Sequence, residues 1–317
     1  MILLNLFFFI FSLVVLLNFS EYAIKYSSQL AKAMRFPEFV VSFFIIALIS
    51  VLPEATIAII SALKGETGLA LGTLLGSNVV DLTLVFGIAS FFSFGGINVK
   101  SKILEDNFLY LVLLLFPLIL GLDGRYSRID GAILFLVGAL FFLKIYLEKD
   151  KFKKKFSRAK KEPILKSSLL LILSVGVILI SAYFTIKFVV SFAEGINIPK
   201  VLIGITVLAF GTCFPELVFS IKAVRKNHDD LALGDLLGTV ITDATIVLGI
   251  VIMISPFNHN FRDLVVTGSA MFISGMMVLF FMKSDKKLKK IEGLFLILFY
   301  ILFVFTEFLV NHWGMFG

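Results

Sequence analysis

Four acidic residues lie inside long apolar stretches of this sequence: Glu54, Asp81, Glu216 and Asp243. If those stretches cross a bilayer, each ionised carboxylate costs at least about 2.5–3.5 kcal/mol at the bilayer centre on insertion scales. Four such groups are tolerated when they face one another, a cavity or bound cations. Their types and positions therefore predict a cation-binding site within the membrane.

Each glutamate directly follows a proline, in Leu52-Pro53-Glu54 and in Phe214-Pro215-Glu216. Proline removes one helical N–H and crowds the carbonyl group four residues earlier. We therefore expect the backbone to open around Ile49–Val51 and Gly211–Cys213. Carbonyl oxygens freed at that depth are tolerated only beside a cavity or a ligand, so they can join the carboxylates as cation ligands.

A ligand set made of oxygen atoms selects among metal ions. Ca²⁺ takes roughly six to eight oxygens in flexible geometry, whereas Mg²⁺ keeps its waters and needs a stricter octahedron; Na⁺ fits by the same hardness argument. Zinc and copper prefer His or Cys ligands. The three histidines fall in loops or at the C-terminus, and Cys213 is interpreted as a small packing residue. Ca²⁺ is thus the first candidate.

Four hydroxyl residues accompany the acids and are the remaining candidate ligands: Ser50, Ser77, Thr212 and Thr239. A lone Ser or Thr in a helix usually bonds back to a carbonyl of that helix, but these four lie near acids and form two matched pairs. Asn78 is left open between ligand and packing. Glycines spaced by four residues let helices approach closely, and we interpret them as packing positions; they are residues 72, 76, 234 and 238.

The elements that position these side chains are membrane-spanning helices. The chain has 317 residues, of which 59% are hydrophobic, and its mean hydropathy is +1.03. A soluble domain cannot cover so much apolar surface, whereas apolar runs of about 20 residues cross a hydrocarbon core about 30 Å thick. We predict an all-α membrane protein with ten spans. They are residues 2–33, 38–63, 69–93, 105–122, 129–147, 167–193, 200–225, 231–255, 263–282 and 291–311.

The two halves of the sequence match at a constant shift of 162 residues, as from Glu54 to Glu216 and from Asp81 to Asp243. The match runs from about residue 25 to residue 131, and it also pairs Ser50 with Thr212 and Ser77 with Thr239. Each half holds five predicted spans, so the second enters the membrane from the opposite side. This is an inverted-topology repeat, whose sites lie near the midplane where the repeats meet.

We therefore divide the chain into three regions: a first five-helix repeat over 1–147, a basic loop over 148–166 and a second five-helix repeat over 167–317. Lys and Arg concentrate in the loop, which the positive-inside rule places in the cytoplasm; binding of anionic lipid or a partner by this loop is compatible with that placement. Both termini are then expected outside the cell membrane. Nothing in the sequence indicates a nucleic-acid ligand or an obligate protein partner.

With these residues in hand, the sequence resembles the cation/Ca²⁺ exchanger superfamily, and within it the prokaryotic Na⁺/Ca²⁺ exchanger branch. The second repeat carries the closest match, from Gly204-Ile205-Thr206 through Ala209–Glu216, and the first carries a good match over Gly72–Gly87. The resemblance covers nearly the whole chain, with alpha-repeat regions at about 38–93 and 200–255.

The resemblance implies a secondary antiporter, not an enzyme, that exchanges Ca²⁺ for monovalent cations, Na⁺ first, by alternating access and without a cofactor. It implies that Glu54 and Glu216 bind Ca²⁺ directly, helped by backbone carbonyls at Ser50 and Thr212. Asp81 and Asp243 would complete the central cluster. The four hydroxyl residues would line flanking Na⁺ sites, and the first span of each repeat would slide against the rest.

The sequence departs from the family pattern at three positions of the site. Val51 and Cys213 stand where the family has Ser, so two hydroxyl ligands for Na⁺ are missing. Asp81 stands where the Na⁺/Ca²⁺ branch often has Asn. A further carboxylate among like charges in a low dielectric favours the protonated form, so exchange of Ca²⁺ for H⁺, or exchange that uses K⁺, stays open.

Two other classes of protein could use acids within a membrane. A cation channel could use the same four acids, but broken helices in symmetric positions favour alternating access. An intramembrane aspartyl protease is suggested by Gly234-Asp235, but Asp235 aligns with Thr73, so the repeat gives it no acidic partner.

Overall fold

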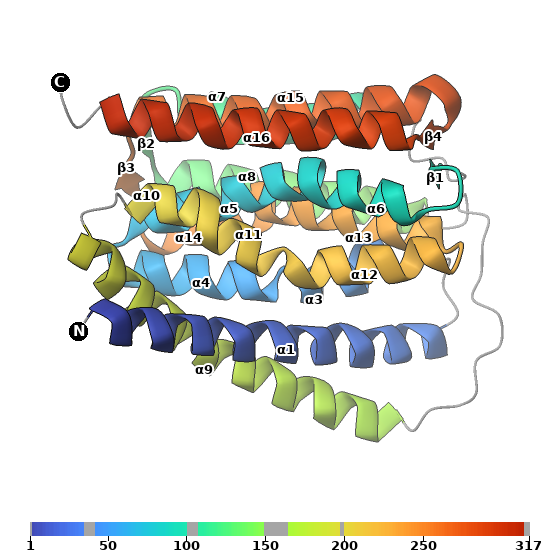
Figure 1. The fold of residues 1–317 in the computed structure, drawn as a ribbon, viewed down its shortest axis with the longest axis horizontal. Coiled ribbons are helices and arrows are strands. Elements are labelled where there is room, and N and C mark those ends of the chain that lie inside the picture. Colours follow the sequence, from blue (N-terminus) through green and yellow to red (C-terminus); the bar gives the residue numbers. More distant parts are fainter. Residues whose placement is uncertain (1, 35–41, 100–106, 149–163, 197–199, 314–317) are drawn as a thin grey trace.

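The computed structural model describes residues 2–34, 42–99, 107–148, 164–196 and 200–313. Most helices run along the long axis of the molecule, and α1 begins at the same end at which α16 ends (Figure 1). Short π-helical turns, labelled η, interrupt several helices. The helical elements are α1 (Ile2–Met34), η1 (Ser42–Ile46), α3 (Ala47–Ser50), α4 (Leu52–Leu63), α5 (Thr67–Val80), η2 (Asp81–Val85), α6 (Phe86–Phe92), α7 (Asn107–Leu120), α8 (Arg128–Leu147), α9 (Ile164–Ile196), α10 (Lys200–Ile203), η5 (Gly204–Leu208), α11 (Ala209–Thr212), α12 (Phe214–Arg225), α13 (Asp229–Ile241), η6 (Thr242–Val247), α14 (Leu248–Ile254), α15 (Phe261–Asp285) and α16 (Lys290–Trp313).

Within the described residues, seven helices are long and apolar enough to cross a membrane, and two bent helix pairs raise that number to nine. The helices around α5 and α13 are largely buried by protein, whereas α1 and α16 expose most of their apolar side chains. The protein is thus a multi-pass membrane protein with a protein-covered centre. The fourth predicted span, 105–122, starts outside the described residues, and its helix α7 has 14 residues. The basic loop predicted over 148–166 also lies almost wholly outside them.

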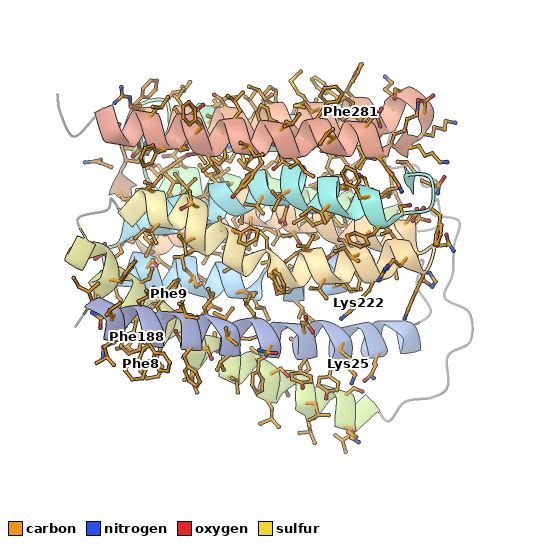
Figure 2. All side chains as sticks on the ribbon, in the orientation of Figure 1. Phe8, Phe9, Lys25, Phe188, Lys222 and Phe281 are labelled. Atoms are coloured by element: carbon orange, nitrogen blue, oxygen red, sulfur yellow. The ribbon has the colours of Figure 1, made fainter. Side chains whose placement is uncertain are left out.

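Helices α1 and α9 form a pair along one side of the molecule (Figure 1). Helix α1 spans 2–34 and α9 spans 164–196, so both ends of α9 lie 162 residues after the corresponding ends of α1. Phe8 stacks on Phe188 with ring centroids 5.1 Å apart (Figure 2), and Thr185 Oγ1 donates to Ser12 Oγ at 3.1 Å. Buried side chains of both helices join a hydrophobic cluster separate from the main core.

Two glycines allow the halves to pack backbone against backbone at matched positions. A Cβ atom on Gly76 would lie 2.8 Å from the Cα atom of Ile205 on η5. A Cβ atom on Gly238 would lie 2.8 Å from the carbonyl oxygen of Phe43 on η1 and 2.7 Å from the Cβ atom of Ala47. The shift of 162 residues relates one contact to the other. The interpretation of these two glycines as packing positions is confirmed.

Short strands that the sequence did not predict also join the halves. Strand β1 (Ile97–Asn98) pairs antiparallel with β4 (Lys287–Leu288), and β2 (Arg125–Tyr126) pairs antiparallel with β3 (Phe257–Asn258). In each pair one strand comes from 1–147 and the other from 167–317. The four strands therefore tie the first half to the second at both ends of the molecule.

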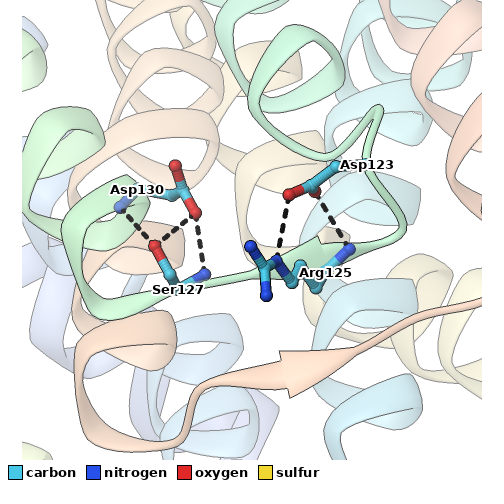
Figure 3. A network of polar contacts seen from close by, with 4 residues as sticks. All are labelled: Asp123, Arg125, Ser127 and Asp130. Carbon is cyan, nitrogen blue, oxygen red and sulfur yellow. Dashed lines mark hydrogen bonds and ion pairs between the residues drawn. The ribbon is translucent and has the colours of Figure 1, made fainter.

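The turn that follows β2 fixes the start of α8 (Figure 3). The Ser127 backbone N–H donates to Asp130 Oδ2 at 2.7 Å, and the Asp130 N–H donates back to Ser127 Oγ at 3.4 Å, so the two residues form a capping box. Arg125 Nε lies 3.2 Å from Asp123 Oδ2. The turn before α16 repeats the arrangement, because the Lys289 N–H donates to Glu292 Oε2 at 2.6 Å.

Candidate ion-binding site

Two helices are broken beside the prolines, as expected from the sequence. The chain bends by 48° at Val51, between α3 and α4, and by 42° at Cys213, between α11 and α12. Each proline is the second residue of the new helix, where an N–H group has no helical acceptor in any case. The break places Glu54 and Glu216 in the first turns of α4 and α12, where the helix dipole favours negative charge.

The aspartates lie where two other buried helices change their winding. Helix α5 passes into η2 at Asp81, and α13 passes into η6 one residue before Asp243. Such π-helical turns are rare and frequently occur at functional sites. Ser77 and Thr239 precede the two aspartates by one helical turn on the same helices. The four predicted acids thus come from four elements, two in each half.

All eight predicted site residues are fully buried, with 0% of their surface exposed. Six of the eight oxygen atoms of the four acids have no hydrogen-bond partner. They are Glu54 Oε2, Asp81 Oδ1, Asp81 Oδ2, Glu216 Oε1, Glu216 Oε2 and Asp243 Oδ1. Buried polar atoms are nearly always satisfied in native proteins, and an uncompensated buried charge is strongly destabilising. These oxygens therefore require cations or protons.

Two contacts at the centre join the first half to the second. Ser77 Oγ on α5 donates to Asp243 Oδ2 on η6 at 3.2 Å. Cys213 Sγ, at the break before α12, lies 3.9 Å from Glu54 Oε1 and 3.5 Å from the carbonyl oxygen of Ser77. Cys213 is buried, as expected of a small packing residue, but it also contacts an acid of the site.

The hydroxyl groups around Thr212 bond back to their own helices. Thr212 Oγ1 donates to the Leu208 carbonyl at 3.0 Å, and Ser77 Oγ donates to the Leu74 carbonyl at 3.0 Å as well as to Asp243. Their oxygen lone pairs stay available. Asn78 Nδ2 donates to the Met271 sulfur at 3.4 Å while its Oδ1 has no partner, so Asn78 fits packing and ligation equally.

Ser50 Oγ lies 3.2 Å from the Ala47 carbonyl oxygen of its own helix and also contacts a carboxylate that sequence reasoning missed. Ser50 Oγ donates to Asp235 Oδ1 at 3.0 Å and lies 3.1 Å from Thr239 Oγ1. Asp235 is fully buried on α13, and its Oδ2 has no hydrogen-bond partner. The repeat gave Asp235 no acidic partner because Thr73 stands at the matched position, but its spacing of four residues from Thr239 places both on one helix face.

The buried acids interact with one another electrostatically. Glu54, Asp81, Glu216, Asp235 and Asp243 are all fully buried, and carboxylates that are ionised together in a low dielectric repel one another strongly. Among the described residues, no three His, Cys, Asp or Glu side chains are grouped so that they alone could hold a metal ion. A cation at this centre would therefore take hydroxyl and carbonyl oxygens in addition to carboxylates.

A cavity of about 160 Å³ lies between α5, η5 and the start of α15. Gly72, Leu75 and Ile205 line its inner part, and His259 and Asp263 line its part near β3. Gly72 and Leu75 are within one or two helical turns of Ser77. The cavity thus approaches the buried acids from the end of the molecule that holds β3.

The family model described as sodium/calcium exchanger protein matches residues 4–146 and 166–309. The sodium/calcium exchanger MaX1 of Methanosarcina acetivorans is 25% identical over 98% of this chain and 100% of its own length. The putative antiporter CaxA of Alkalimonas amylolytica is 30% identical over 78% of this chain and 80% of its own length. A solved structure of the sodium-calcium exchanger NCX_Mj superposes with a TM-score of 0.72 and 24% identity, covering 95% of this chain and 98% of that one.

Proposed function

The chain belongs to the sodium/calcium exchanger protein family, and on that premise we propose that it is a secondary antiporter that exchanges Ca²⁺ for monovalent cations, Na⁺ first. It is a transporter and not an enzyme. The observation that carries the proposal is the set of six carboxylate oxygens that are buried without hydrogen-bond partners at the centre of the protein. Carboxylate oxygens of this kind are typical ligands of hard cations.

Glu54 and Glu216 bind Ca²⁺ directly in this proposal, with backbone carbonyls at Ser50 and Thr212 as further ligands. Asp81 and Asp243 complete the central cluster, and the hydroxyls of Ser50, Ser77, Thr212 and Thr239 serve flanking Na⁺ sites. The burial of all eight residues and the breaks at Val51 and Cys213 support these roles. Because no three acids are grouped at the centre among the described residues, the carbonyl and hydroxyl oxygens make up the rest of the Ca²⁺ shell in this proposal.

Exchange follows from electrostatic competition between cations. Ca²⁺ at the centre offsets part of the carboxylate charge, and its departure leaves acids that repel one another in a low dielectric. An empty and fully charged site is then too costly to pass between the two sides of the bilayer. Return requires that monovalent cations or protons replace Ca²⁺, which couples the two fluxes.

The fold that we propose for this cycle has ten transmembrane helices in two inverted five-helix repeats, 1–147 and 167–317, joined by the basic loop 148–166. Helix α7 is the fourth of these spans and completes the ten. The matched bounds of α1 and α9 support the repeat, and so do the matched glycine contacts between the halves. Helices α1 and α9 share a hydrophobic cluster with residues of α4, α5, α10 and η5, apart from the main core, and in this proposal they are the elements that slide to alternate access.

We place the protein in the plasma membrane with both termini outside the cell. The start of α1 and the end of α16 lie at one end of the molecule (Figure 1), and Lys25 and Lys222 lie toward the opposite end (Figure 2). Basic residues favour the cytoplasmic side. The cavity at the β3 end then opens toward the outside.

Exchange for H⁺ is the second candidate, and one contact favours it. Cys213 Sγ stands beside Glu54 where a serine would supply a hydroxyl ligand for Na⁺, and Val51 replaces the matched serine in the first half. Each replacement weakens the oxygen shell of a flanking Na⁺ ion. Protons, which need no shell, are then the competitor for the same acids.

The test is ⁴⁵Ca²⁺ uptake into proteoliposomes loaded with Na⁺, with K⁺ or with an acidic buffer inside. We expect uptake driven by an outward Na⁺ gradient. Uptake only with an acidic interior would replace Na⁺ by H⁺, and uptake only with K⁺ would replace it by K⁺. Flux that does not saturate and does not depend on any counter-ion would show a channel and contradict exchange.

A further inference from the structure

A histidine in the cavity at the β3 end has two ring nitrogens without hydrogen-bond partners. His259 lines this cavity, and its Nδ1 and Nε2 atoms are buried and make no hydrogen bond within the described residues. Its ring centroid lies 4.9 Å from that of Tyr126 and 6.4 Å from that of Phe257, and its backbone N–H donates to the Gly124 carbonyl oxygen at 3.1 Å. Neighbouring aromatic rings therefore hold the imidazole while its nitrogens stay available to a ligand.

Oxygen atoms near the start of α15 share the cavity with this imidazole. Asp263 follows His259 by four residues and also lines the cavity. Thr267, one helical turn further along α15, lines it too, and its Oγ1 donates to Oε1 of the fully buried Glu307 at 2.5 Å. Because its proton is directed to Glu307, the Thr267 hydroxyl can offer only lone pairs to a second ligand. A carboxylate and a hydroxyl acceptor thus accompany the imidazole.

The first half of the chain lacks this chemistry at the matched positions. The shift of 162 residues relates His259 to Ile97, which is fully buried in the main hydrophobic core. Beside Ile97, Asn98 donates through its backbone N–H and its Nδ2 to Asp229 Oδ2 at 3.0 and 2.8 Å. The repeated fold therefore does not require an imidazole at this position, and His259 adds chemistry that the scaffold alone does not have.

We propose that His259 and Asp263 bind a divalent cation of borderline softness, for which Zn²⁺ is the probe, in this cavity. Zn²⁺ takes imidazole nitrogen at about 2.0–2.1 Å and carboxylate oxygen at about 2.0–2.2 Å, whereas Ca²⁺ and Mg²⁺ take oxygen ligands. The site is separate from the central acids and selects a different class of ion. It does not depend on the proposed exchange function.

The charge and the exposure of the cavity favour a cation that keeps water. Asp263 repels an anion, and the exposed Arg262 beside it in sequence is not among the residues that line the cavity. Two protein ligands leave two of the four positions that Zn²⁺ usually fills. Water can enter these positions because Asp263 is partly exposed, and the amide oxygen of Asn258, which lines the cavity, is a further donor. Such a site holds an exchangeable ion, unlike the four-ligand sites that stabilise a fold.

The experiment measures ⁶⁵Zn²⁺ bound to the purified full-length protein in detergent by equilibrium dialysis, with excess Ca²⁺ present to occupy the central acids. His259→Phe keeps an aromatic ring against Tyr126, and Asp263→Asn keeps the shape of its side chain. For each variant we expect the Zn²⁺ dissociation constant to rise roughly tenfold or more, since even the loss of a group that only orients a metal ligand costs about 10–100-fold. His228→Gln, in the turn between α12 and α13, is the matched control and should bind Zn²⁺ like the wild type.

Two outcomes would overturn the proposal. One is a wild-type protein that binds no ⁶⁵Zn²⁺ under these conditions. The other is Zn²⁺ binding that neither His259→Phe nor Asp263→Asn weakens; if Cys213→Ser abolishes that binding, the ion lies at the central acids instead. Should His259→Phe not fold, His259→Gln must weaken Zn²⁺ binding for the proposal to stand. Zn²⁺ binding that behaves as expected in a protein without ⁴⁵Ca²⁺ uptake would refute only the exchange function.

Discussion

Each half of the site has one serine that contacts a carboxylate on a helix of the other half: Ser50 contacts Asp235, and Ser77 contacts Asp243. The two contacts differ in the acid, because Asp243 has a matched aspartate in Asp81 whereas Asp235 is matched by Thr73, which bonds back to its own helix. The flank of the site beside Ser50 thus carries an extra acid, and the matched flank does not. The two flanks come from matched positions of a repeat, and their backbones break and pack alike. The difference teaches that duplication supplies a symmetric scaffold while single side chains set the ion chemistry of each side.

The largest effect should come from the acids that the two halves share. Glu54→Gln and Glu216→Gln each remove a proposed Ca²⁺ ligand at matched positions, so each should lower ⁴⁵Ca²⁺ uptake in proteoliposomes at least about 100-fold, since losing one partner of a buried charge pair costs several kcal/mol. Asp123→Asn, at an exposed acid, is the control. Near-normal uptake in both glutamine variants would contradict the assignment of Glu54 and Glu216 as Ca²⁺ ligands.

The next effect concerns the packing that the halves share. Gly76→Ala and Gly238→Ala place a Cβ atom 2.8 Å and 2.7 Å from atoms of the opposite half, and overpacking of this kind costs about 1–3 kcal/mol. Both variants should lower the thermal unfolding temperature in detergent by similar amounts. Gly176→Ala on α9, where no atom lies within 4 Å of the added carbon, should not. Equal stability of all three would contradict close contact between the halves.

A smaller effect should separate the flanks by their affinity for Na⁺. Cys213→Ser restores a hydroxyl in the flank without the extra acid, and Val51→Ser restores one beside Asp235. We expect Cys213→Ser to lower the Na⁺ concentration for half-maximal exchange about three- to tenfold, in line with about 1 kcal/mol for one added polar contact. Val51→Ser should do less, because the Asp235 carboxylate already contacts Ser50 in that flank. The reverse order in a Na⁺ titration of uptake would argue against an asymmetric site.

The smallest effect should come from two matched surface turns, and it should depend on pH. The backbone N–H of Arg125, with its guanidinium, lowers the pKa of Asp123, so that contact stabilises the folded state above the ordinary carboxylate pKa and is lost as pH falls. The Asp285 carboxylate raises the pKa of Lys289, so that contact is lost as pH rises past the folded-state pKa of the lysine.

Asp123→Asn should therefore differ slightly from the wild type in thermal unfolding at neutral pH and converge with it in acid. Asp285→Asn should differ slightly from the wild type at neutral pH and converge with it in strong base, where Lys289 loses its proton. All these side chains are exposed, so the shifts should be small. A large shift at neutral pH in either variant would mean that these turns contribute more to stability than their exposure indicates.

Much of the site could be predicted because its signals are local. Pro53 and Pro215 predict the helix breaks that the structure has, and the repeat gives that signal twice; the ligand role of Glu54 and Glu216 stays a prediction. The spans also followed from apolar runs, as with α8, predicted over 129–147 and found over Arg128–Leu147.

Other features carried no local signal. The repeat argues against a site role for Asp235, because Thr73 stands at the matched position. The contact of Asp235 with Ser50 depends on how α13 packs against α3, and no local sequence pattern predicts that packing. The two-residue strands show no periodicity that a sequence could reveal, and they form only because the halves meet. The π-helical turns likewise depend on packing around Asp81 and Asp243.

The exchanged strands have a mechanical consequence. Strand pairs β1–β4 and β2–β3 connect the two halves, one pair at each end of the molecule. A close backbone contact between the halves occurs where Gly87 meets Gly293, and a matched one occurs where Gly131 meets Gly249. In the proposed transport cycle we expect these strand pairs to oppose rocking of one half against the other as a rigid body. The movement would then fall to helices outside the strand pairs, and among the described residues α1 and α9 are long helices that no strand adjoins.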